Sequence, residues 1–199
     1  MGVNSYEKPD FWSKKAFSEG YPARSVYKLK EINEKFSLFS SSCVLDLGSA
    51  PGSWTLFILR ALGGSGKLVS VDLKPLAKNI AGANLMFFQG DLYADDVFAR
   101  VKGEGPYDAL VCDAAPPTTG NRLIDTSRSA ALAELAFEYA RTVLKEGGNF
   151  AVKIFQGGDQ QALLEKMRTV FASARSFKPT ACRSESFEIY LIGLNKKAE

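Results

Sequence analysis

The sequence predicts an α/β fold, with a mostly parallel β-sheet covered by helices on both faces and an antiparallel strand at its C-terminal end. Short apolar runs alternate with segments whose apolar residues recur every three or four positions. Glycine-rich breaks at 63–66 and 147–148 follow two of these helical segments. Near the C-terminus two apolar runs follow one another with no helical segment between them, which favours a hairpin.

The elements can be assigned in chain order from these patterns. Strands are expected at 43–47, 68–72, 85–89, 107–113, 149–155 and 187–194, with 174–178 as the hairpin partner of the last. Helices are expected at 54–62, 95–101, 128–144 and 160–171, and a further helix at 23–36 precedes the first strand. Alternating strands and helices form a parallel sheet buried on both faces, which explains the nearly continuous apolar runs.

Length and composition are those of one folded domain. The chain has 199 residues, 46% hydrophobic and 24% charged, without an internal repeat, a low-complexity segment or a linker. No apolar run approaches the roughly 20 residues that span a bilayer, and the polar N-terminus lacks the apolar region of a secretory signal. We therefore expect a single domain over residues 1–199, located in the cytoplasm.

Histidine is absent, and the three cysteines, Cys43, Cys112 and Cys182, lie far apart in the chain. The absence of histidine removes the usual general base and the commonest zinc ligand. Three cysteines without a CxxC pair give neither a disulfide framework nor a zinc-ligand spacing, so Cys43 and Cys112 are expected in the core. Acid–base chemistry must then use Lys, Asp, Glu or Tyr, and no metal is expected.

Positive charge is concentrated at the two ends of the chain. The net charge is +3; residues 1–36 hold seven Lys/Arg against five Asp/Glu, and residues 175–199 hold five against three. The 138 residues between them hold thirteen against fourteen. This distribution favours an anionic partner near the chain ends.

Small and acidic residues follow the first three expected strands. Ligands of open α/β sheets bind beyond the carboxyl ends of the strands, and the segment 46–54, DLGSAPGSW, would let a ligand approach the backbone closely. Its DxGxxxG spacing differs from the GxGxxG loop that admits a pyrophosphate, so a nucleoside ligand suits it better. Asp72, at the end of the second strand, can accept hydrogen bonds from ribose hydroxyls, and Asp91, after the third, can accept one from an adenine amine.

These motifs together resemble the FtsJ/RlmE family of RNA ribose 2′-O-methyltransferases over about residues 10–194. The matching segments are YPARSVYKLKEI (21–32), VLDLGSAPGSWT (44–55), CDAAPPTTG (112–120), FAVKIF (150–155) and FEIYLI (187–192). The resemblance implies a Rossmann-like, S-adenosylmethionine-dependent methyltransferase fold with a seven-stranded sheet. It also implies methylation of a ribose 2′-hydroxyl in RNA, and the compact chain favours a uridine of large-subunit ribosomal RNA.

The resemblance also assigns roles to particular residues. The family's catalytic Lys-Asp-Lys-Glu set matches Lys28, Asp113, Lys153 and Glu188, and its S-adenosylmethionine contacts match Gly52, Trp54, Asp72, Asp91 and Asp113. Glu185 is an alternative to Glu188, which is preferred because it directly precedes the aromatic–aliphatic strand. Pro117 and Thr118 replace more polar residues often found after the Asp-x-Ala-Pro core.

The residue types suit the implied chemistry. A 2′-hydroxyl must be aligned with the sulfonium methyl group and must lose its proton. Lys153 is the expected proton acceptor, which requires a lowered pKa; otherwise it would orient the hydroxyl's lone pair. Lys28 would lower that pKa, whereas Asp113 and Glu188 would raise it.

The N-terminal segment, residues 1–36, interleaves aromatic and basic side chains. Lys14, Lys15 and Arg24 are expected to bind RNA phosphates, while the aromatic rings either stack on bases or pack against the domain. The alternatives for the whole chain are a transfer RNA anticodon-loop 2′-O-methyltransferase and a non-catalytic RNA-binding ribosome assembly factor. A nucleobase or protein N-methyltransferase would instead often carry an Asn/Asp-Pro-Pro-aromatic motif after the fourth strand.

Overall fold

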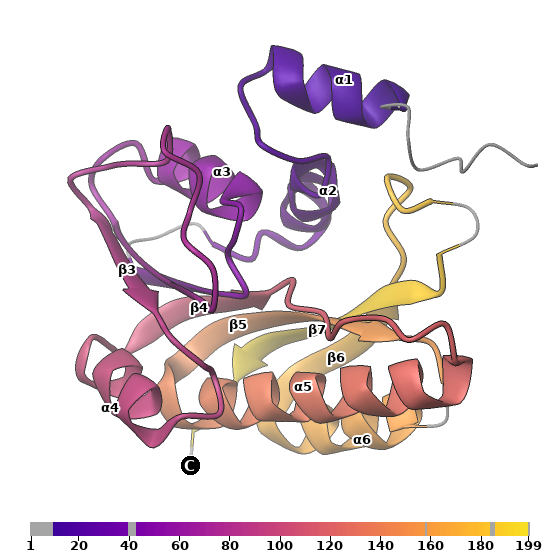
Figure 1. The fold of residues 1–199 in the computed structure, drawn as a ribbon. Coiled ribbons are helices and arrows are strands. Elements are labelled where there is room, and N and C mark those ends of the chain that lie inside the picture. Colours follow the sequence, from indigo (N-terminus) through magenta and orange to yellow (C-terminus); the bar gives the residue numbers. More distant parts are fainter. Residues whose placement is uncertain (1–9, 40–42, 158, 184–185, 199) are drawn as a thin grey trace, which may run out of the picture.

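The computed structural model describes residues 10–39, 43–157, 159–183 and 186–198 (Figure 1). The strands are β1 (Cys43–Leu47), β2 (Lys67–Asp72), β3 (Leu85–Gln89), β4 (Tyr107–Cys112), β5 (Leu144–Phe155), β6 (Phe171–Phe177) and β7 (Glu188–Lys196). The helices are α1 (Phe11–Ser18), α2 (Val26–Phe36), α3 (Ser53–Leu62), α4 (Asp95–Gly103), α5 (Arg122–Val143) and α6 (Asp159–Val170).

The seven strands form one sheet in the order β3-β2-β1-β4-β5-β7-β6. The pairs from β3 to β5 are parallel, whereas β7 is antiparallel to both β5 and β6. The expected fold class is therefore confirmed, including the C-terminal hairpin. The strand order reverses direction between β1 and β4, and the carboxyl ends of these two strands are where such sheets bind ligands.

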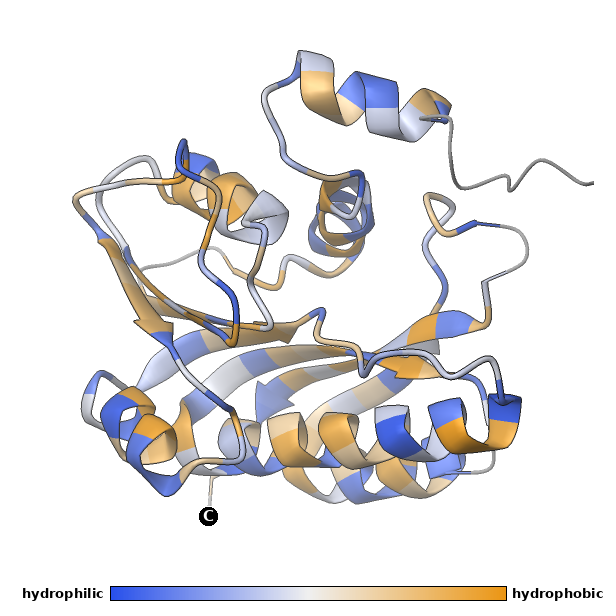
Figure 2. Ribbon diagram, viewed as in Figure 1, coloured by the Kyte–Doolittle hydropathy of each residue, from blue (hydrophilic) through white to orange (hydrophobic). Residues whose placement is uncertain are grey.

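Two apolar layers cover the sheet, one on each face. Helices α4, α5 and α6 pack on one face, and α2 and α3 pack on the other, with α1 lying outside α2 (Figure 1). Hydrophobic and hydrophilic residues alternate along the helices, as expected for elements with one buried side (Figure 2). Among the described helices, none is both long and apolar enough to cross a membrane. Of the two cysteines expected in the core, Cys112 is buried and Cys43 is half-buried.

The largest differences from the expected elements lie at helix starts. Helix α5 begins six residues before the expected 128, because the Asn121 side chain accepts hydrogen bonds from the backbone N–H groups of Leu123 and Ile124. Leu123 and Ile124 are exposed, so the buried apolar pattern starts only later. The expected helix 23–36 is α2, and α1 was missed because only Ala16 of its residues is buried.

Strand β5 also begins earlier than expected. It starts at Leu144 rather than at 149, and its register with β4 shifts between Tyr107 and Ala109. Such a shift inserts extra residues into one strand. The glycines at 147 and 148 therefore lie within the irregular first part of the strand, where the sequence pattern indicated a break.

A carboxyl group is buried inside the first strand. Asp46 is fully buried and accepts a hydrogen bond from the Thr55 hydroxyl at 2.7 Å, which ties β1 to α3. Burial raises the pKa of Asp46 to about 7; the Thr55 hydrogen bond opposes this shift, and Asp113 and Asp72 add to it. Ionising Asp46 near neutral pH therefore costs the folded state free energy.

This environment makes stability depend on pH in a defined direction. Because the folded-state pKa of about 7 exceeds the ordinary value of 3.8, the folded chain binds more protons, and the contribution of Asp46 to stability falls as pH rises between these values. The variant Asp46→Asn keeps the Thr55 contact but cannot ionise. Between pH 5 and pH 8 we expect its free energy of unfolding to fall by roughly 2 kcal/mol less than that of the parent chain. Urea unfolding at both pH values measures this difference, and equal pH dependence in the two proteins would contradict it.

Candidate active site

A pocket of about 570 Å³ lies at the carboxyl ends of the central strands. Its walls come from the segments that follow β1, β2, β3 and β4, and from α5. The lining residues include Gly48, Ala50, Asp72, Leu73, Asp91, Tyr93, Asp113, Pro116, Arg128 and Leu132. The volume falls within the range of small-molecule sites, and the position is the one expected from the strand order.

The glycine loop after β1 is packed against the loop after β4. Gly48 has φ of +71°, and a Cβ atom built on it would lie 2.4 Å from the Cβ of Ala114. The position therefore excludes any side chain, both by conformation and by space. The glycine therefore allows the two loops to pack directly against each other, and both line the pocket.

Asp72 and Asp91 line the pocket, as the sequence predicted. The Asp72 carboxylate accepts hydrogen bonds at 2.8 Å from the backbone N–H groups of Ala50 and Lys74, so it fixes the glycine loop while facing the pocket. Asp91 accepts one from Tyr93 N–H at 3.0 Å. Each carboxylate oxygen can accept further bonds, so both can hold ligand hydroxyl or amine groups.

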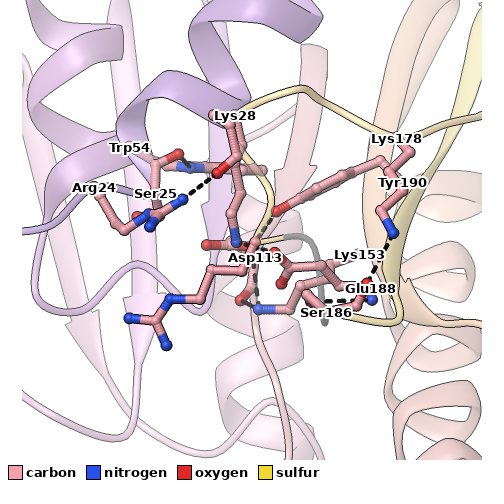
Figure 3. Close-up of polar contacts among 12 residues, drawn as sticks. Arg24, Ser25, Lys28, Trp54, Asp113, Lys153, Lys178, Ser186, Glu188 and Tyr190 are labelled. Carbon is pink, nitrogen blue, oxygen red and sulfur yellow. Dashed lines mark hydrogen bonds and ion pairs between the residues drawn. The ribbon is translucent and has the colours of Figure 1, made fainter. Parts of the chain in front are cut away.

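Lys28, Asp113, Lys153 and Glu188 converge beside this pocket (Figure 3). Lys153 Nζ lies 3.1 Å from Asp113 Oδ1 and donates to the Asp113 carbonyl oxygen at 2.5 Å. Lys28 Nζ lies 2.5 Å from Glu188 Oε1. The structure thus brings all four predicted residues together from α2, the end of β4, β5 and β7; Glu185, the alternative to Glu188, lies outside the described residues.

The four charges stabilise one another. Burial alone would raise the pKa of Asp113, but Lys153, Lys28 and a hydrogen bond from Tyr190 together hold it below its usual range. Burial works to lower the pKa of Lys28, yet Asp113 and Glu188 raise it above the ordinary value. Two cations therefore face two carboxylates in a cluster without excess charge, as buried ionic groups require.

Tyr190 is a site residue that the sequence reasoning did not single out. Its hydroxyl donates to Asp113 Oδ1 at 2.7 Å, and it stands opposite Lys153 in the β5–β7 register. The signal was present in the FEIY segment, because Tyr190 follows Glu188 by two residues and so shares its face of the strand.

Two predicted cofactor residues do not line the pocket. Trp54 is buried, lies 5.8 Å from the Tyr190 ring and donates its Nε1–H to the Ser25 carbonyl oxygen at 2.9 Å. A Cβ atom on Gly52 would lie 2.7 Å from Ile80 Cγ1. The structure gives both residues supporting positions behind the loop, and their contact with a cofactor stays a prediction.

Conversely, Arg128, Leu132 and Tyr93 line the pocket but were not predicted to be site residues. Arg128 and Leu132 belong to the first half of α5, and the apolar spacing of that helix pointed only to core packing. Their contribution arises from the way the helix crosses the strand ends.

The three cations predicted to bind RNA differ in their surroundings. Lys14 is exposed on α1, and Lys15 lies over the rings of Trp12 and Tyr27, at 5.6 and 5.1 Å. Of the aromatic rings in this segment, Trp12 and Tyr27 thus pack together, whereas Phe11 and Phe17 are exposed.

Arg24 is already engaged within the chain. It pairs with Asp10, the N-cap of α1, and donates to the Ala181 carbonyl oxygen at 2.5 Å. It therefore joins the N-terminal helices to the segment that precedes Glu188, and an RNA contact for it stays a prediction.

The strand order, the pocket at the switch point and the lysine–carboxylate cluster define a Rossmann-like methyltransferase. The profile described as FtsJ-like methyltransferase matches residues 21–196. The chain therefore belongs to the FtsJ-like methyltransferase family.

Individual relatives agree with this assignment. The chain is 59% identical over 198 residues to ribosomal RNA large subunit methyltransferase E of Treponema denticola, covering 99% of this chain and 100% of that protein. It is 46% identical to the protein of the same name from Treponema pallidum, covering 96% and 95% of the two chains.

Solved structures also resemble the fold. A putative ribosomal RNA methyltransferase from Plasmodium falciparum superimposes with a TM-score of 0.76 at 26% identity, covering 90% of this chain and 100% of that one. Human methyltransferase-like protein 13, solved in complex with SAH, has a TM-score of 0.59 at 15% identity, covering 87% and 82%, and shares the fold.

The role of Asp72 can be tested by titrating S-adenosylmethionine into the purified protein. Asp72→Ala removes a charged acceptor that lines the pocket and frees the glycine loop, so we expect affinity to fall by about 10- to 100-fold, as for loss of a hydrogen bond to a charged group. Asp96→Ala, on an exposed turn of α4, is the control and should bind normally. Equal affinity of both variants, measured by calorimetry, would remove Asp72 from the site.

Proposed function

We propose that this chain transfers a methyl group from S-adenosylmethionine to a ribose 2′-hydroxyl of large-subunit ribosomal RNA, at a uridine. The observation that carries the proposal is the position of Asp113, which lines the pocket and also contacts Lys153 in the charged cluster. A methyl donor in the pocket and a hydroxyl at the cluster would therefore meet at one carboxylate. The names of the relatives, ribosomal RNA large subunit methyltransferase E, support the RNA substrate.

The pocket suits the proposed donor. The carboxylate of Asp72 would accept from the ribose hydroxyls of the nucleoside, and that of Asp91 from its exocyclic amine. Gly48 lets the loop after β1 pack directly against the segment after β4, so both would border the bound nucleoside. When bound, S-adenosylmethionine supplies a methyl group on a positively charged sulfur, which is an electrophile and needs no metal.

The cluster suits the acceptor. Lys153 would contact a hydroxyl bound beside the pocket, and its bonds to the Asp113 side chain and carbonyl oxygen fix the direction of its amine. As a neutral amine it would take the hydroxyl proton; as an ammonium ion it would orient the hydroxyl's lone pair toward the methyl group. The Lys28–Glu188 pair forms the neighbouring charged wall, and alignment in this setting can supply several kcal/mol of the barrier reduction.

The proposed function also assigns roles to the domain as a whole and to its N-terminal segment. Residues 1–199 would act as one methyltransferase domain, with the basic N-terminal segment contributing to RNA binding through Lys14, Lys15 and Arg24. The relatives named after large-subunit ribosomal RNA come from Treponema, bacteria whose ribosomes assemble in the cytoplasm, so the proposal includes work in the cytoplasm.

Lys153 gives the most direct test of the proposed reaction. We expect Lys153→Ala to lower the single-turnover rate on unmodified large ribosomal subunits by at least about 100-fold, because it removes the group that contacts the hydroxyl. Affinity for S-adenosylmethionine should change little. Lys153→Arg keeps the charge but does not deprotonate, so loss of activity in both variants supports proton removal or lysine-specific alignment, while rescue by arginine assigns an electrostatic role. A turnover near that of the parent chain in Lys153→Ala would refute the mechanism.

If the N-terminal cations bind RNA phosphates, replacing them should change how RNA affinity depends on salt concentration. Lys14→Glu combined with Lys15→Glu should weaken RNA binding and flatten the plot of log affinity against log salt by about one to two units, because fewer counterions are released. The matched control is Arg100→Glu combined with Lys102→Glu on α4, which makes the same charge change and, at Arg100, also removes a cation–π contact. Filter binding at several salt concentrations measures both slopes, and identical slopes would exclude the α1 lysines from the RNA interface.

A further inference from the structure

The burial of the charged cluster constrains how a ribose can reach it. The side chains of Lys28 and Glu188 are each 12% exposed, Asp113 is 15% exposed and Lys153 is 9% exposed. A nucleotide stacked within a helix presents its 2′-hydroxyl on a wide surface, which does not fit so enclosed a group of atoms. The nucleotide must therefore turn out of its stack, and its base loses the contacts that it made with its neighbours.

An aromatic ring stands next to the cluster. Phe155 ends strand β5, two residues after Lys153, and lies opposite Glu188 in the β5–β7 register, as Lys153 lies opposite Tyr190. Strand alternation puts the side chains of Lys153 and Phe155 on one face, about 7 Å apart along the strand. The base of a nucleotide is attached to the carbon beside the one that carries the 2′-hydroxyl, so a base at this site would lie within reach of Phe155.

Phe155 is supported from behind. The Phe187 ring meets it in a T-shaped arrangement at 4.7 Å, and the Arg122 guanidinium lies 5.5 Å from the centre of the Phe187 ring. The backbone is also fixed, because Phe155 N–H donates to the Ser129 hydroxyl at 3.0 Å and the next N–H along the chain donates to the Phe187 carbonyl oxygen at 2.7 Å. This arrangement gives a ring whose orientation is held before any ligand arrives.

Core packing does not account for these rings. Phe155 and Phe187 are half-buried and belong to none of the three apolar clusters that fill the described structure. Within the described residues Arg122 makes no ion pair, so its charge remains available to an anionic partner. An aromatic face with a neighbouring guanidinium is the surface on which unpaired bases stack in single-stranded RNA recognition.

We propose that Phe155, backed by Phe187 and Arg122, is the stacking platform for the base of the nucleotide whose ribose is methylated. The inference rests on the proposed function and adds a substrate subsite to it. Stacking on Phe155 replaces the neighbours that the base leaves, so it favours the turned-out nucleotide and holds its 2′-hydroxyl at the charged cluster.

The first experiment compares aromatic and aliphatic side chains on unmodified large ribosomal subunits. Phe155→Leu keeps apolar bulk but has no π face, and it should lower kcat/KM by roughly 10- to 100-fold, the loss expected for one stacked base. Phe155→Tyr should stay within a few-fold of the parent chain. Phe98→Leu is the matched control, because Phe98 also makes a T-shaped pair, with Tyr139 at 4.9 Å, but on α4 away from the cluster. S-adenosylmethionine affinity should be the same in all four proteins.

A second experiment distinguishes stacking of Phe155 on the base from a structural effect of Phe155 on the position of Lys153. Large-subunit RNA is assembled with a ligated synthetic segment that carries either the normal nucleotide or an abasic ribose at the mapped methylation site. If Phe155 stacks on the base, the defect of Phe155→Leu disappears on the abasic RNA, because both proteins then lack the interaction. A defect that persists on abasic RNA, or full activity of Phe155→Leu on normal subunits, overturns the platform. If the parent chain methylates no ribose at all, the proposed function fails instead.

Discussion

The ion pair between Lys153 and Asp113 joins the adjacent parallel strands β4 and β5, next to the point between β1 and β4 where the strand order reverses, and the site is organised around it. Both side chains are largely buried, and isolated charges in that position would destabilise the fold strongly. The Tyr190 hydroxyl and the Lys28–Glu188 pair complete the compensation. The charged cluster is therefore stable only as a set, which ties strands β4, β5 and β7 to helix α2.

Sharing Asp113 between the pocket and the cluster determines what the site can do. The carboxylate is held by Lys153 on one side and faces the pocket on the other, so a donor and an acceptor bound there would have a fixed relative position. Most of the groups involved stand on strands or directly at strand ends, where backbone hydrogen bonds limit their movement. Such rigidity is what alignment of two reacting groups requires.

The N-terminal helices supply one of the cluster residues and also hold neighbouring segments in place. Helix α2 supplies Lys28, and Arg24 links the cap of α1 at Asp10 to the segment that leads to Glu188. Under the proposed function, the basic N-terminal segment would bind the RNA substrate and also help to order the reacting groups.

The sequence by itself determined the fold class through its apolar periodicity and the glycine loop through its spacing, and its resemblance to the FtsJ/RlmE family identified the four cluster residues. It did not determine the early start of α5, whose cap at Asn121 precedes two exposed apolar residues, or the position of Trp54 behind the loop. Phe155 gained its significance only from the β5–β7 register, which sets it opposite Glu188, and Tyr190 gained its own from the hydrogen bond to Asp113. Register depends on the packing of the whole sheet, and no local segment of the sequence specifies it.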